Sequence, residues 1–232
     1  MKGGALRLSK QFKWVLFIRF FGYLIFFLGI LSFLFVLGPV ANAEFSYRKD
    51  NILGIKRTVP RIVTSSGEAT SSGNFGSITL DAESITPIDT DFGIVIEKIN
   101  ANARVIANVD PANEKDYIKA LSLGVAHAKG TNFPGEKGNI YLFSHSTDAP
   151  WNIVRFNAIF YLLREVGSGD RIIVFYQNKR YDYIVYDKVI AAADDVSYLT
   201  NKYDASVLTL QTCDPPGTLL HRLIVRAKLA GS

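Results

Sequence analysis

A run of 21 residues without any charge, residues 20–40, is the feature that most limits what this chain can fold into. As a helix rising ~1.5 Å per residue, the run spans roughly 30 Å, the thickness of the hydrocarbon core of a bilayer. All the charged residues that precede it are basic, namely Lys2, Arg7, Lys10, Lys13 and Arg19. Because basic residues stay on the cytoplasmic side, we predict a cytoplasmic segment over residues 1–19 and a transmembrane signal-anchor helix over residues 20–40.

A cleaved signal peptide is the competing interpretation of this run. Pro39 followed by Ala41-Asn42-Ala43 resembles the small-residue site at which signal peptides are cut. The apolar core of a signal peptide is typically ~7–15 residues, however, and this run is longer. We therefore favour a retained, single-pass anchor in the plasma membrane. Both interpretations place the rest of the chain outside the cytoplasm.

The composition changes after the apolar run. Residues 64–77 are mainly Ser, Thr and Gly, which is typical of a flexible linker. We predict an extracytoplasmic linker over residues 41–77 and one folded domain over residues 78–232. Five of the 26 basic side chains precede residue 44, and the remaining 21 are matched by 21 acidic ones. The domain thus lacks the basic surplus of a nucleic-acid-binding face, and we expect no nucleic-acid partner.

The domain is predicted to be mainly β. Apolar or alternating runs indicate strands at residues 93–99, 103–107, 171–176 and 181–186, and the last two form a hairpin. A short helix is expected over residues 113–122, with Asn113 as its N-cap. A second is expected over residues 152–166, where apolar residues recur at helical spacing up to Gly167. Many short strands with only two short helices favour a β-barrel or sandwich.

The stretch at residues 206–229 carries the candidate chemistry. Two β-branched, apolar runs flank Pro215-Pro216-Gly217, which predicts strand, turn and strand. Cys213, the only cysteine, ends the first strand, and Arg222 lies near the start of the second. A lone cysteine is often a small buried hydrophobe. An unpaired thiol outside the cytoplasm is exposed to oxidation, however, which adds weight to a reactive role.

Acyl transfer through a cysteine needs a thiolate, a proton carrier and a group that stabilises the oxyanion. His145, at the end of an apolar strand, is the best candidate for the proton carrier, and Arg222 offers forked donors for the oxyanion. His127 remains an alternative base, whereas His221 should point away from the face that carries Arg222. Arg226 shares that face but lies ~13 Å farther along an extended strand.

Each of these residues also has an ordinary structural explanation. A lone histidine on an apolar strand is more often a satisfied core residue, and the two arginines could form a solvated strand face. The spacing of the single Cys and three His matches no metal-site pattern, and no G-x-S-x-G motif supports a serine hydrolase. We expect no metal and no cofactor.

Several ordered motifs resemble the sortases, a family of membrane-anchored cysteine transpeptidases. Residues 209–213, TLQTC, are similar to the TLxTC signature of the family, and residues 127–139, HAKGTNFPGEKGN, resemble the segment that precedes its catalytic histidine. Residues 149–151 and 169–174 resemble pieces that follow that histidine, and the spacing from Cys213 to Arg222 matches as well. The resemblance covers residues 92–229, and one departure is Ser144, where the family usually has glycine.

The resemblance implies an eight-stranded sortase β-barrel in which Cys213, His145 and Arg222 are the catalytic residues. It implies cleavage of an LPxTG-like sorting signal through a Cys213 thioacyl intermediate, and transfer of the acyl group to an amine of a cell-wall precursor or a pilin lysine. The partners would be surface proteins with a C-terminal sorting signal, and substrate selectivity would rest within residues 187–205. No acidic lid motif is evident, which favours protein anchoring over pilus assembly. Hydrolysis of the thioester, or a non-catalytic anchored binding module, are the alternatives.

Overall fold

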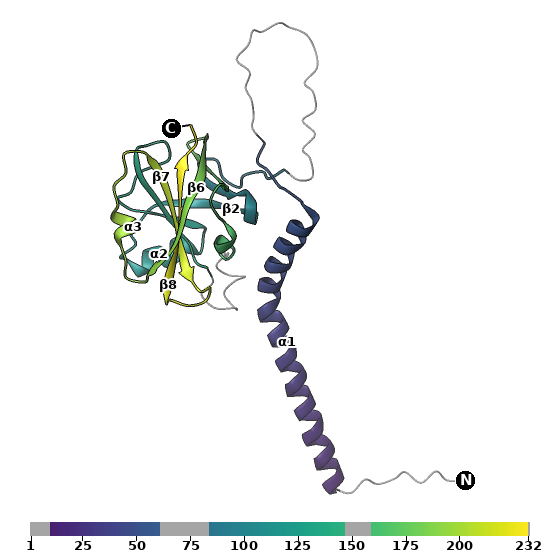
Figure 1. Ribbon diagram of the computed structural model, residues 1–232. Coiled ribbons are helices and arrows are strands. Elements are labelled where there is room, and N and C mark those ends of the chain that lie inside the picture. Colours follow the sequence, from purple (N-terminus) through teal and green to yellow (C-terminus); the bar gives the residue numbers. More distant parts are fainter. Residues whose placement is uncertain (1–9, 61–83, 147–158, 232) are drawn as a thin grey trace, which may run out of the picture.

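The computed structural model describes residues 10–60, 84–146 and 159–231, which form one long N-terminal helix and a β-barrel beside its C-terminal end (Figure 1). Eight strands close the barrel in the order β1-β2-β3-β4-β7-β8-β6-β5. Their bounds are β1 Phe92–Ile96, β2 Ala101–Val109, β3 Val125–Ala128, β4 Gly138–Phe143, β5 Arg171–Tyr176, β6 Lys179–Ala192, β7 Ser206–Asp214 and β8 His221–Leu229. The expected eight-stranded barrel is confirmed.

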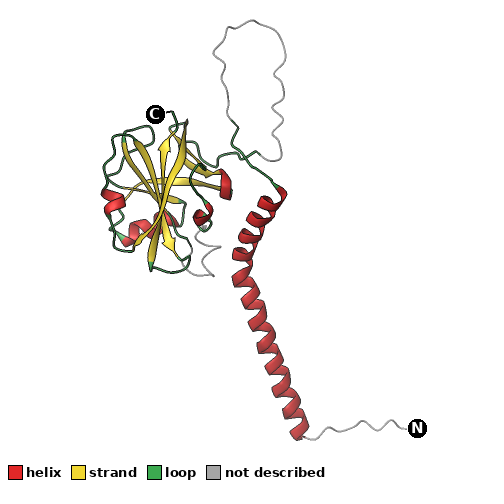
Figure 2. Cartoon of the chain, in the orientation of Figure 1, coloured by secondary structure: helices red, strands yellow, loops and turns green. Residues whose placement is uncertain are grey.

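Helices are few in the described part of the domain (Figure 2). They are α2 (Glu114–Leu121), the single turn α3 (Ser197–Thr200) and two 3-10 helices, Glu97–Ile99 and Leu163–Glu165. The Asn113 side chain accepts a hydrogen bond from the Asp116 amide, so the predicted N-cap of α2 is confirmed. Of the second expected helix, residues 152–158 lie outside the described residues. Its described part holds turns and the 3-10 helix instead of an α-helix.

Alternation along β7 and β8 decides what faces the core and what faces out. Leu208 and Leu210 of β7, and Leu223 and Val225 of β8, belong to the main cluster of buried residues that fills the barrel. Since successive side chains of a strand point to opposite faces, Cys213 and Arg222 lie on the outer face. The chemistry of the two strands is therefore carried by the barrel's outer surface, and their aliphatic residues hold the barrel together.

The pairing of strands brings distant parts of the chain together. β4 runs parallel to β7, which places Tyr141 opposite Thr209 and Phe143 opposite Gln211. β8 folds back antiparallel on β7 and places Arg222 opposite Cys213. The β5–β6 hairpin turns at Gln177 and Asn178, whose φ angles of 51° and 60° fit a two-residue turn that matches strand twist. The expected hairpin is thus present, with its second strand longer than predicted.

Helix α1 spans Lys10–Leu53 and contains one segment, Phe12–Phe35, that is long and apolar enough to cross a membrane. Its mean hydropathy is 2.2, and none of its most apolar stretch is buried against the rest of the chain. The helix ends at Gly54, whose φ of +66° suits the left-handed residue that follows a helix. Residues 41–53, the start of the predicted linker, are therefore helical. Residues 1–9 and the Ser/Thr/Gly segment lie outside the described residues.

Candidate active site

One groove on the outer surface of the barrel is lined by all three residues singled out from the sequence, Cys213, His145 and Arg222. Its volume is about 590 Å³, within the range of ordinary ligand pockets. Helix α2 forms one wall, residues 193–199 form another, and the β7–β8 turn closes one end. The floor comes from the last residues of β4 and β7. The groove is thus assembled from four separate parts of the sequence.

Cys213 and Arg222 meet because β7 and β8 are antiparallel neighbours. The two residues are directly paired, and the side chains of such a pair have Cβ atoms about 5 Å apart. Cys213 is half-buried, so the small-buried-hydrophobe explanation does not describe it. The Arg222 guanidinium donates hydrogen bonds to the main-chain carbonyls of Leu219 and His221 at 3.4 and 3.2 Å. Both of these acceptors are neutral, so neither cancels the charge that Arg222 brings to the groove.

His145 lies two residues beyond the end of β4, in the loop that follows, rather than within the strand as expected. The preceding residue is held tightly to β7. The Ser144 amide donates to the Gln211 carbonyl at 3.1 Å, and the Thr212 hydroxyl donates to the Ser144 carbonyl at 2.9 Å. Because Thr212 is the neighbour of Cys213, these bonds fix the chain before His145 next to the cysteine.

His127, the alternative base, occupies a different environment. Its ring is fully buried and packs against Phe92 and Phe133. Nε2 lies 3.0 Å from the Asn132 carbonyl, and Nδ1 accepts a hydrogen bond from the Asn108 amide at 3.3 Å. Burial lowers the pKa of His127, only partly opposed by the Asn132 carbonyl. This neutral, fully bonded ring does not line the groove and is a core histidine.

Arg226 also differs from Arg222, although both lie on the outer face of β8. Arg226 forms a salt bridge of 2.6 Å with Asp187 and donates to the Tyr203 hydroxyl at 3.3 Å. Its guanidinium also lies over the rings of Tyr186 and Tyr198. Arg226 is therefore tied into a structural cluster that joins β8, β6 and residues 198–203. His221 is exposed at the start of β8 and does not line the groove.

Further groove residues were not identified from the sequence. Tyr141 is almost fully buried, and its hydroxyl donates to Oε1 of Gln211 in a short hydrogen bond. Burial raises the pKa of Tyr141, and the nearby charge of Arg222 acts to lower it. Gln211 precedes Cys213 by two residues and therefore lies on the same face of β7. Strand alternation alone could have identified Gln211 from the sequence. Tyr141 could be placed only once β4 was known to pair with β7.

Acidic side chains also line the groove, Glu114 from α2 and Asp195 from the segment after β6. Hydrogen bonds from the hydroxyl and the amide of Ser197 lower the pKa of Asp195. Residues 187–192, the first part of the segment expected to govern selectivity, belong to strand β6, so only its later part reaches the groove. Across residues 10–60, 84–146 and 159–231, no three His, Cys, Asp or Glu side chains gather as metal ligands would.

Comparisons with known proteins agree with this architecture. The family model of the Sortase domain matches residues 94–230. Sortase D of Bacillus subtilis (strain 168) is 27% identical over 120 residues, which are 52% of each protein, so the chain spans about half the length of this curated relative.

Solved structures give the same picture. The sortase C1 of GBS pilus island 1 superimposes with a TM-score of 0.52 at 26% identity, over 61% of this chain and 64% of that one. A lid mutant of sortase A from Corynebacterium diphtheriae superimposes with a TM-score of 0.50 at 25% identity, over 62% and 72% of the two chains.

Proposed function

The chain belongs to the sortase family of cysteine transpeptidases, and from this premise we propose that it cleaves an LPxTG-like sorting signal and joins the released acyl group to an amine. The observation that carries the proposal is the presence of Cys213, His145 and Arg222 in one groove, with Cys213 and Arg222 paired across adjacent strands. A thiol, an imidazole and a guanidinium are the three functions that acyl transfer through cysteine requires.

In the first half of the proposed reaction, the Cys213 sulfur attacks the carbonyl carbon of the threonine in the signal. The negative charge that develops on the carbonyl oxygen is stabilised by the positively charged, forked guanidinium of Arg222. The bond to the following glycine nitrogen then breaks, and His145 donates its proton to that leaving amine. A thioester between Cys213 and the threonine acyl group remains.

In the second half, an amine takes the place of the departed peptide. His145 removes a proton from the incoming amine, whose nitrogen attacks the thioester carbonyl, and the Cys213 thiolate leaves. The product is a new amide bond, and the charges of the thiolate and imidazolium are restored. The amine would come from a cell-wall precursor or a pilin lysine, and the substrates are surface proteins with a C-terminal sorting signal.

The N-terminal helix fits this activity. The apolar span Phe12–Phe35 is compatible with a membrane anchor. Because the only charged residues before the charge-free run at residues 20–40 are basic, we place the N-terminus in the cytoplasm and the barrel on the extracytoplasmic face. Substrates with a membrane-held tail would then share the same surface as the enzyme, which raises their effective concentration.

A peptide assay with the full chain in nanodiscs tests the proposal. A quenched LPxTG-like peptide is incubated with and without an amine such as triglycine, and the products are identified by mass spectrometry. We expect cleavage together with an amine adduct, and no cleavage by Cys213→Ala. Cleavage that yields only the free acid at every amine concentration would identify a peptidase. Cleavage that survives in Cys213→Ala would remove the proposed nucleophile.

A further inference from the structure

The turn between β7 and β8 presents an unusual surface for a water-exposed loop. Residues 215–220, Pro-Pro-Gly-Thr-Leu-Leu, carry no charge. Leu219 and Leu220 are adjacent and have 74% and 65% of their surface exposed. A single exposed leucine is ordinary, but two neighbours at the tip of an uncharged turn form an apolar point that water solvates poorly.

The turn lies at the end of the barrel that faces the membrane span. Strand β8 starts at the end of the barrel nearer the N-terminal half of α1 and runs to the opposite end, where the C-terminus lies (Figure 1). The apolar span occupies that N-terminal half of α1. The β7–β8 turn is therefore directed toward the level at which α1 leaves the bilayer.

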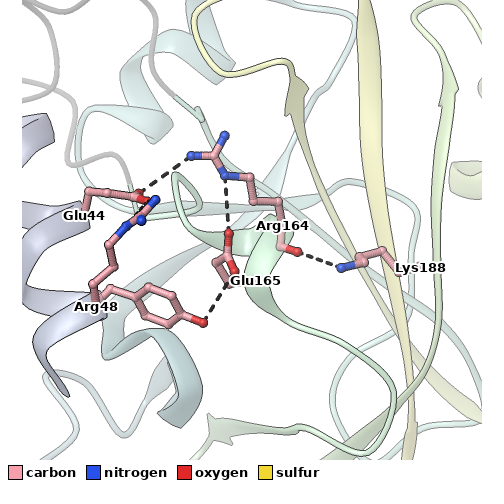
Figure 3. A network of polar contacts seen from close by, with 6 residues as sticks. Glu44, Arg48, Arg164, Glu165 and Lys188 are labelled. Carbon is pink, nitrogen blue, oxygen red and sulfur yellow. Dashed lines mark hydrogen bonds and ion pairs between the residues drawn. The ribbon is translucent and has the colours of Figure 1, made fainter. Parts of the chain in front are cut away.

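A set of contacts between α1 and the barrel, here called the junction, fixes this orientation. Glu44 of α1 lies 3.8 Å from Arg164, and the Tyr47 hydroxyl lies 3.5 Å from Glu165 (Figure 3). Tyr47 also packs against the barrel core. The Arg48 guanidinium donates a hydrogen bond to the Glu44 carboxylate. Lys188 of β6 donates a hydrogen bond to the Arg164 carbonyl at 2.6 Å, which extends the network across the barrel surface.

The chain just after α1 strengthens the junction. Val59 is buried with Ile85 against the outer face of β1 and β5. Its amide donates to Glu97 at 2.9 Å, and its carbonyl accepts from Arg180 at 3.0 Å. Contacts at several separate points resist swinging of the barrel far better than one surface ion pair does.

The spacing along α1 sets the height of the barrel above the bilayer. Glu44 lies nine positions after Phe35, the end of the apolar span, which corresponds to a rise of roughly 14 Å. That is roughly twice the depth of one headgroup layer, because headgroups add roughly 5–8 Å to each side of the hydrocarbon core. A barrel held beside this stretch of helix has its lower end close to the lipid headgroups.

From these observations we propose that the β7–β8 turn is a lipid-contacting element, with Leu219 and Leu220 seated among the headgroups of the membrane that α1 spans. Leu219 also lines the groove, so this contact would position the entrance of the groove at the membrane surface. The inference rests on the proposed anchoring by α1, and it does not depend on the transpeptidase chemistry.

Site-specific fluorescence tests the contact without reference to activity. The full chain carrying Cys213→Ala and Leu220→Cys is labelled with the environment-sensitive dye NBD and placed in phosphatidylglycerol-containing nanodiscs with or without nitroxide-labelled lipid. The matched control is Lys179→Cys, an exposed site in the β5–β6 turn at the other end of the barrel. We expect strong quenching at residue 220 and little at residue 179. Equal quenching at the two sites overturns the proposal. A signal at residue 220 that follows protein concentration rather than nitroxide lipid also overturns it, in favour of a second copy of the chain.

An activity measurement separates the contact from a structural role of the turn. Leu220→Ser is made in the wild-type background, because Leu220 does not line the groove. We expect unchanged cleavage of a soluble peptide and several-fold slower cleavage of the same signal fused to a membrane-inserted tail. An equal loss on both substrates assigns Leu220 to barrel stability and overturns the proposal. If the wild-type chain cleaves neither substrate, the proposed function fails, and the fluorescence comparison alone decides whether the turn contacts lipid.

Discussion

Two arginines on the same outer face of β8 are held in opposite ways. Arg226 is tied to Asp187 by a salt bridge of 2.6 Å and is flanked by tyrosines. Arg222, four residues closer to the β7–β8 turn, donates hydrogen bonds of 3.4 and 3.2 Å to two main-chain carbonyls and lines the groove. The same type of side chain is thus part of a structural cluster at one end of the strand, and at the other end it lines the groove in which we propose that the substrate binds.

The histidines repeat this contrast. His127 is buried, with both ring nitrogens engaged by main-chain groups. His145 sits in a loop at the edge of the groove, beside the cysteine strand. One histidine is thus enclosed in the core, and the other lines a surface groove. Four measurements can break or sharpen this comparison.

The largest effect is expected at the two histidines. Removing a general acid and base costs typically 10²–10⁴-fold, so His145→Ala should lower kcat/KM for peptide cleavage by about 10³-fold. His127→Gln, the matched change in the core, should leave kcat/KM within about threefold while lowering the melting temperature. The reverse ranking would move the proton carrier to His127 and undo the contrast.

The arginine pair gives the next largest effect. Lysine keeps the charge of Arg222 but loses the forked donors, so Arg222→Lys should reduce kcat/KM by about 10²-fold. Arg226→Lys, in the structural cluster, should retain nearly full activity. Steady-state kinetics on both variants provide the comparison, and a fully active Arg222→Lys enzyme would show that the fork has no role in the reaction.

The pH dependence of stability tests the buried state of His127. Its pKa is lowered in the folded barrel, so below about pH 6.5 the unfolded chain takes up a proton that the folded ring does not. The free energy of unfolding should therefore fall as the pH drops below this value, by up to about 1.4 kcal/mol per pH unit. Denaturant titrations between pH 7 and 5 measure the slope. His127→Gln should have a smaller slope, and an identical slope in both proteins would contradict the assignment.

The smallest effect is expected on the groove floor. Tyr141→Phe removes the hydrogen bond to Gln211, at a cost of about 1 kcal/mol in the free energy of unfolding. Catalysis should change little, because the ring that shapes the floor remains. Tyr117→Phe, on the α2 wall of the same groove, is the control and should change stability less. A large fall in kcat with unchanged stability would instead give the Tyr141 hydroxyl a direct part in the reaction.

The sequence predicted best the features that depend on neighbours in the chain. The pairing of Cys213 with Arg222 follows from two strands joined by one short turn, and the cap of α2 follows from Asn113 itself. His145 could be named only by chemistry and by resemblance to a family, because the parallel pairing that brings it to the groove joins strands more than 60 residues apart. Strand β3 was missed, since its four buried residues are too few to show a period.

The N-terminal helix was underestimated for a related reason. Residues 41–53 mix charged and apolar side chains, and the helix there meets the barrel at Glu44 and Tyr47. Such contacts depend on the tertiary structure. The hydropathy of the sequence identifies the apolar span, and it carries no signal for the helical turns that continue beyond it.

The parallel pairing of β4 with β7 also determines when, during folding, the groove residues come together. Residues 144–205, which include the β5–β6 hairpin, must all be synthesised before Ser206 can lie against Gly138. Until these strands pair, Cys213 and His145 lie on separate parts of an unfolded chain. On the proposed mechanism, the nascent protein therefore stays inactive until the last strands close the barrel.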